Sequence, residues 1–221
     1  MEISSVLRAQ SVRTTKPRAF DAVSAFELVD AVKDRYNFRQ VPTTQEINAG
    51  SPTNFVFGKM REGDREVTIE SFSIVYYGTF ATGITAVTRS STDDADLFLD
   101  DLRQWAVDKY KFDVTPIIPA NYHSQLEVIF NKTLDKRFEG LKQFGVTVAD
   151  FLRGYGFNKY PDFEPIGFSM HFDGTKPDRY AAAFSLERRA GAPYESNKYF
   201  AQAPLKTDHH IEVLRQIEEW L

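Results

Sequence analysis

Residues 92–105 read TDDADLFLDDLRQW, and residues 207–220 read TDHHIEVLRQIEEW. Both segments begin with Thr-Asp and end with Trp, and both place apolar side chains three and four residues apart, as amphipathic helices do. Thr92 and Thr207 suit a helix start, because a hydroxyl accepts hydrogen bonds from the unpaired N–H groups of the first turn. We therefore expect two equivalent helices that stand 115 residues apart, each closing one half of the chain.

The segments between these helices alternate apolar and polar residues, which is typical of half-buried strands. The sharpest alternation covers residues 166–172 and 180–188. Short turns separate the strands, and short turns favour antiparallel pairing. Further helices are expected at 20–36 and at 135–144, the second one ending at Gly145 as a C-terminal cap. Thr147 and Asp150 suit the start of a further short helix. The sequence therefore predicts an α+β protein whose mostly antiparallel sheet is covered by helices.

An internal duplication of a β-α-β-β-(β)-α module explains why the same order of elements occurs twice. Chance is the alternative, because Thr-Asp is a common helix start and any two amphipathic helices share leucines at some offset. Two prolines, Pro116 and Pro119, mark the boundary between the halves. The expected modules are 1–115 and 120–221, either separate or packed as a single domain.

Composition excludes several classes of protein. The 221 residues include no cysteine, so disulfides, thiolate metal sites and a cysteine nucleophile are excluded, and a reducing, cytoplasmic location is expected. The net charge of −4 argues against general binding to nucleic acid, which makes a duplicated, saddle-like nucleic-acid-binding module the weakest hypothesis. No apolar run approaches the ~20 residues of a membrane span, so no membrane partner is expected.

Recognised catalytic motifs are missing: the glycines form no phosphate-binding loop, and there is no nucleophile elbow or zinc-protease helix. We therefore expect a protein that works without catalysis, cofactor or metal. The best catalytic candidates are His171, Asp173 and Glu187, on the polar face of the predicted hairpin. If its strands pair so that His171 faces Ser185 or Glu187, the arrangement suits acid–base work in a small-molecule hydrolase or isomerase. The alternative is a solvated polar sheet face.

Two other polar groups of residues have simple explanations. The acidic residues between Asp93 and Asp101 lack the loop spacing and the glycine of a calcium site, so a solvated helix face is the better interpretation. His209 and His210 lie in a predicted first helical turn and diverge by ~100°, so they cannot easily share a metal ion. A surface position is expected for both.

The segment 187–204 combines charge with aromatic residues and shows little regular pattern. Arginine and aromatic residues are enriched at protein interfaces, and the candidate binding residues here are Arg188, Arg189, Tyr194, Tyr199 and Phe200. The alternative is that Tyr199 and Phe200 anchor the segment to the core. The leading hypothesis is a non-enzymatic protein-binding or assembly protein that uses a sheet face and the 187–204 loop to bind a protein partner or to self-associate.

Overall fold

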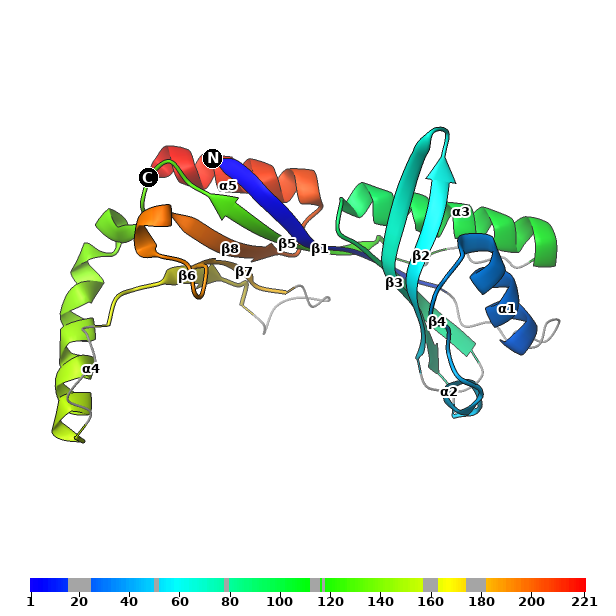
Figure 1. The fold of residues 1–221 in the computed structure, drawn as a ribbon, viewed down its shortest axis with the longest axis horizontal. Helices are drawn as coiled ribbons and strands as arrows, with labels where there is room; N and C mark the ends of the chain where they lie inside the picture. The colour runs from blue at the N-terminus through cyan, green and yellow to red at the C-terminus, as the bar shows by residue number, and fades with distance from the viewer. Residues whose placement is uncertain are drawn as a thin grey trace. The chain divides into compact units, whose positions relative to one another are not determined.

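The computed structural model describes residues 1–15, 25–49, 52–77, 80–111, 116, 118–156, 163–173 and 182–221. The α+β prediction is confirmed, because these residues form an antiparallel sheet and α-helices (Figure 1). The strands are β1 (Glu2–Thr14), β2 (Thr53–Glu62), β3 (Arg65–Tyr77), β4 (Phe80–Thr88), β5 (Asn121–Ile129), β6 (Gly167–Met170), β7 (Phe184–Arg188) and β8 (Lys198–Ala203). The α-helices are α1 (Ala25–Tyr36), α2 (Thr44–Asn48), α3 (Thr92–Tyr110), α4 (Lys142–Gly154) and α5 (Thr207–Trp220). Short 3-10 turns are η1 (Asp135–Arg137), η2 (Glu139–Leu141) and η3 (Tyr194–Ser196).

The eight strands follow one another in the order β2-β3-β4-β1-β5-β8-β7-β6. In the first half of the chain, β1 pairs with β4, β4 with β3, and β3 with β2. The second half repeats this order, with its first strand, β5, beside its last strand, β8, and then β7 and β6. The common order supports the predicted duplication, which remains a prediction.

The chain divides into two compact units. The first-half unit comprises Val6–Gln125 and Ala203–His210, and the second-half unit comprises Met1–Ser5, Leu126–Gln202 and Ile211–Leu221. Elements such as β1, β5 and α5 thus contribute residues to both units. The division into modules 1–115 and 120–221 stays a prediction.

An aromatic core holds the first-half unit together. Apolar side chains of α1, β2, β3, β4 and α3 form one buried cluster, so both helices cover the same face of the strands. At its centre Phe72 of β3 packs edge-on against Phe98 of α3, with ring centroids 5.3 Å apart, and lies 5.4 Å from Phe55 of β2. Such ring pairs add to the stabilisation from burial itself.

The second-half unit has a core of its own. Leu126, Val128 and Phe130 alternate along β5 and its end, and Tyr199 of β8 lies fully buried 5.1 Å from the ring of Phe130. The Tyr199 hydroxyl accepts a hydrogen bond from the backbone N–H of Leu134. This polar tip is therefore satisfied inside the core, as a buried tyrosine requires.

The two tryptophans show one similarity and one difference. The guanidinium of Arg35 lies 5.6 Å from the ring of Trp105, and that of Arg137 lies 4.5 Å from the ring of Trp220. Trp105 packs against the core of its unit, whereas Trp220 is 53% exposed. The two tryptophans therefore share a cation–π contact but differ in burial.

The helix predicted at 135–144 is wrong. Residues 135–137 and 139–141 form 3-10 turns, and α4 begins only at Lys142. Gly145 lies inside this helix. A Cβ at this position would collide with the backbone of Phe163, whose N–H donates to the Gly145 carbonyl at 3.4 Å. The glycine thus permits a close backbone approach and does not cap a helix.

The segment 187–204 is also more regular than predicted, because it contains the strand β8. Tyr199, Ala201 and Ala203 alternate as buried residues along this strand, and Leu186 of β7 pairs with Ala201. Of the predicted strand 180–188, residues 184–188 form β7, residues 182–183 are not in a strand, and residues 174–181 lie outside the described residues. The predicted helix 20–36 likewise includes residues 20–24, which lie outside the described residues.

Candidate functional site

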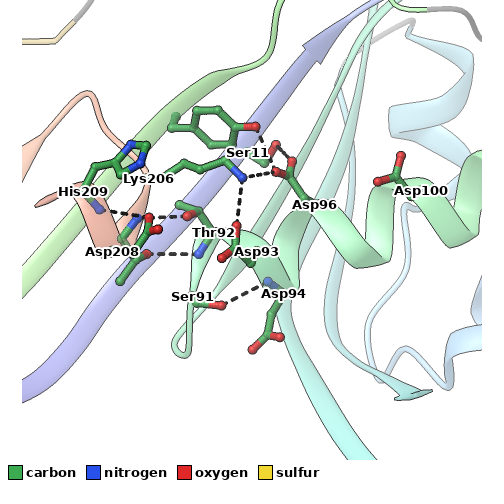
Figure 2. A network of polar contacts seen from close by, with 12 residues as sticks. Ser11, Ser91, Thr92, Asp93, Asp94, Asp96, Asp100, Lys206, Asp208 and His209 are labelled. Atoms are coloured by element: carbon green, nitrogen blue, oxygen red, sulfur yellow. Dashed lines mark hydrogen bonds and ion pairs between the residues drawn. The ribbon is translucent and has the colours of Figure 1, made fainter. Parts of the chain in front are cut away.

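A polar network connects the first turns of α3 and α5 (Figure 2). The N-cap of α3 is Ser91, whose Oγ accepts from the Asp94 N–H at 3.1 Å, so the expectation that Thr92 caps this helix is wrong. Thr92 instead pairs with Thr207: each backbone N–H donates to the other hydroxyl, at 3.0 and 2.9 Å. Thr92 and Thr207, which the predicted duplication would make equivalent, therefore bind each other reciprocally.

Asp96 is the centre of this network. Its carboxylate accepts from Ser11 at 2.7 Å, from Tyr122 at 2.8 Å and from Arg13 at 3.1 Å, and it forms an ion pair with Lys206 at 3.3 Å. Burial alone would raise the pKa of Asp96, but these hydrogen bonds outweigh it and lower the pKa. Each interaction favours the ionised carboxylate, so the network stabilises the start of the helix.

The other carboxylates of the acidic run are paired as well. Their ion pairs are Asp93–Lys206 at 2.8 Å, Asp94–Arg65 at 2.6 Å, Asp100–Arg13 at 2.5 Å and Asp101–Arg35 at 2.9 Å. The run therefore faces basic side chains of neighbouring segments. Within the parts of the chain that the structure describes, no group of three or more His, Cys, Asp or Glu side chains is placed to hold a metal ion.

His210 is fully buried, which corrects its predicted surface position. The Ser124 hydroxyl donates to the Leu205 carbonyl at 3.1 Å, and its oxygen lies 2.8 Å from Nδ1 of His210. Since a hydroxyl has one hydrogen, Nδ1 of His210 carries the proton of this contact. Burial, with a smaller contribution from His123, lowers the pKa of His210 to about 4. The ring is therefore neutral near pH 7.

The predicted catalytic residues are not brought together by the strand register. β6 ends at Met170, and Ser169 pairs with Ser185 while Gly167 pairs with Glu187. His171 lies beyond the end of β6, so the expectation that it faces Ser185 or Glu187 across the ladder is wrong. His171, Asp173 and Glu187 are all exposed. A catalytic role for them stays a prediction that this register does not support.

The predicted binding residues divide into two groups. Arg188 and Tyr199 are buried: Arg188 binds Asp135, and its guanidinium lies 4.3 Å from the ring of Tyr194. Tyr199 therefore anchors the segment to the core, which was the alternative to a role in binding. The accessible residues are Arg189, which pairs with Glu127 at 2.9 Å, Tyr194, which is 41% exposed, and the partly exposed Phe200. A binding role for these three stays a prediction.

The described residues also form a hollow of about 550 Å³ beside β3. Charged side chains line it, including Arg65, Arg89, Glu70 and Asp94. Arg65 binds Asp94 at 2.6 Å, and Arg89 binds Glu70 at 2.5 Å. Both arginines of this hollow are therefore paired with carboxylates of its lining.

The described residues also form an exposed apolar surface. Of the fifteen large apolar side chains that the described residues expose, ten lie between residues 141 and 172. Five of these occur at alternating spacings of three and four residues, and we call them the α4 surface: Leu141, Phe144, Val148, Phe151 and Tyr155, exposed by 48, 60, 44, 62 and 73%. Soluble proteins rarely expose a contiguous patch of this kind unless it binds something.

Local packing explains why α4 exposes this stripe. Its contact with the rest of the second-half unit lies beside the stripe, where Ala149 is buried and Gly145 meets the backbone of Phe163. Figure 1 shows α4 extending beyond strands β6–β8 of the same unit. The stripe was not predicted, because the expected cap at Gly145 divides this helix into two short ones. The spacing of Phe144, Val148 and Phe151 was the signal that could have revealed it.

Comparison with known proteins gives no family: no protein-family model matches the chain, and a search of curated proteins finds no match either. Among the helices of the described residues, none has both the length and the apolar character that crossing a membrane requires.

Proposed function

We propose that this protein is a non-enzymatic binding or assembly protein that associates with protein through the α4 surface. The observation that carries the proposal is the exposure of Phe144, Phe151 and Tyr155 on one side of a single helix. Helices whose apolar residues recur at these spacings dock against other helices or into apolar grooves. The proposed contact lies on α4 and not in segment 187–204, because Arg188 and Tyr199 of that segment are buried.

The energetics favour coverage of this surface. A fully exposed phenylalanine presents roughly 200 Å², so covering the exposed part of Phe151 would remove about 120 Å² of apolar area from water. At about 25 cal/mol per Å², that burial is worth about 3 kcal/mol. Several such residues together can offset the loss of translational and rotational freedom on association.

Site-specific photocrosslinking tests the proposal. Benzoylphenylalanine replaces Phe151 in one variant and Val146 in another; both residues are exposed and apolar, but Val146 lies on the opposite side of α4. Each full-length variant is irradiated as concentrated purified protein and in an extract of its native cells. We expect covalent protein adducts from position 151 and few or none from position 146. Equal labelling from both positions, or no adduct from position 151, would contradict the proposal.

A further inference from the structure

We propose that the partner of the α4 surface is a second copy of this chain, whose own α4 lies antiparallel along the first. This inference rests on the proposed function and adds the identity and direction of the partner helix. It draws on the spacing of the surface residues, the charges beside them, their side-chain sizes and the area they offer.

The spacing matches a helix-pairing seam. From Leu141 to Tyr155 the intervals are three, four, three and four residues, in the order 141, 144, 148, 151 and 155. This is the a and d pattern of a two-stranded coiled coil, in which apolar side chains of one helix insert between those of the other. Leu141 ends η2 and Tyr155 follows α4 directly, so the seam extends along the whole helix.

The residues beside the seam carry no charge. Thr147 and Gly154 flank it on one side, and Gly145 and Leu152 flank it on the other. The charged residues of α4 lie elsewhere on the helix, and Arg153 pairs with Asp150 at 2.7 Å. A partner with a charged groove would find no complementary charge among the α4 residues next to the seam. Two copies of this helix, in contrast, meet without like-charge repulsion, and this neutrality favours a second copy.

Side-chain sizes favour the antiparallel direction. In an antiparallel pair an a residue faces a d residue, so Val148 faces Phe151 of the second copy and Phe144 faces Tyr155. Val148, the smallest residue of the seam, then meets the large Phe151 in both central layers, so no layer consists of two small residues. In a parallel pair Val148 would face Val148 and Phe151 would face Phe151, so the same layers would be alternately too thin and too thick. The opposed helix dipoles of an antiparallel pair also attract.

The exposed area is sufficient for a weak dimer. With roughly 150–250 Å² for each fully exposed aromatic side chain, the α4 surface presents about 500 Å² of apolar area per copy. Two copies would bury about 1,000 Å² from the seam alone, close to the lower limit of about 1,200 Å² for specific interfaces. Residues at the rim supply the remainder, so we expect a reversible dimer of micromolar affinity.

Sedimentation velocity over a range of concentrations tests the proposal on the full chain. We expect the wild type to form a dimer as its concentration rises. Phe151→Glu should weaken the dimer by more than about tenfold, because it places a charge in the seam. Val146→Glu is the matched control, since it makes a similar change on the other side of the same helix, and it should leave dimerisation unchanged. Far-UV circular dichroism shows whether each variant keeps its fold.

Cysteine crosslinking tests the direction, since the wild-type chain has no cysteine. Thr147→Cys and Gly154→Cys lie on the same side of the seam and leave its five residues intact. In the antiparallel pair position 147 lies near position 154 of the other copy, so a mixture of the two variants should form mixed disulfides in excess over either variant alone. Disulfides between like positions only would overturn the antiparallel arrangement.

The outcomes separate this inference from the proposed function. A wild type that stays monomeric at all concentrations, while position 151 photocrosslinks to a different protein, overturns the second-copy inference and leaves the proposed function standing. A dimer that Phe151→Glu does not weaken also overturns the inference. If position 151 crosslinks to no protein at all, both fail.

Discussion

Acidification should destabilise this protein well before its carboxylates titrate. His210 is fully buried, and burial lowers its pKa to about 4, whereas an unfolded histidine titrates near pH 6.5. The unfolded chain therefore binds a proton as the pH falls through about 6.5, while the native protein does not bind one at this site until about pH 4. The stability due to the neutral ring is complete above pH 6.5 and is lost progressively between pH 6.5 and pH 4.

The size of the effect follows from the difference in proton affinity. At pH 5 the solution is about 1.5 units below the pKa of the unfolded imidazole. Protonation then stabilises the unfolded chain by about 2 kcal/mol, and the folding stability falls by that amount relative to pH 8. His123 adds to this loss in the same direction, because burial lowers its pKa as well. Carboxylates with lowered pKa, such as Asp96, lose their contribution only at lower pH, since it is present above their ordinary pKa.

Urea unfolding at a series of pH values from 8 to 5 measures this loss. The control is His210→Asn, which keeps a polar side chain beside Ser124 but cannot take up the proton. This variant is expected to be less stable at pH 8 and to show a pH dependence smaller by about 2 kcal/mol over the same interval. A wild type that is equally stable at pH 8 and pH 5, or a variant with an unchanged pH dependence, would refute the reasoning.

Three further substitutions test the packing. Thr207→Val removes the hydroxyl that accepts from the buried N–H of Thr92, and should cost about 1–2 kcal/mol in urea unfolding; an unchanged midpoint would show that this bond is dispensable. Phe98→Ala empties the aromatic core of the first-half unit and should cost about 3–5 kcal/mol by the same assay, whereas a loss below 1 kcal/mol would contradict the packing described. Gly145→Ala places a methyl group against the backbone of Phe163 and should cost about 1–3 kcal/mol, seen as faster hydrogen exchange in α4; unchanged exchange would argue against this contact.

The sequence predicted the parts of the fold in which one physical signal dominates. Alternation revealed β6 and β7, and the apolar stripe and the terminal acidic residues revealed α3. The start of α3 shows the limit of this reasoning: Ser91 and Thr92 both suit a cap, and only the approach of Thr207 decides which hydroxyl serves the helix. A contact between residues so far apart leaves no local pattern.

The candidate site was harder to predict than the fold. Gly145 has two physical uses, as a helix terminator and as a place for close backbone approach, and the sequence does not distinguish them. The first use divided the predicted helix between Phe144 and Val148, so the continuous stripe of the α4 surface was not predicted. In segment 187–204 the aromatic residues suggested an interface, but Tyr199 points into the core because β8 pairs there with β7. Pairing over this distance could not be inferred from composition.

Hydrogen exchange of the α4 backbone, compared at low and at high protein concentration, tests the central claim most directly. If the apolar side of this helix is a protein contact made between copies, amides of residues 142–154 should become more protected as the concentration rises, while those of α3 should not change. Exchange in α4 that is independent of concentration, in a protein shown to be folded, would contradict the self-association account.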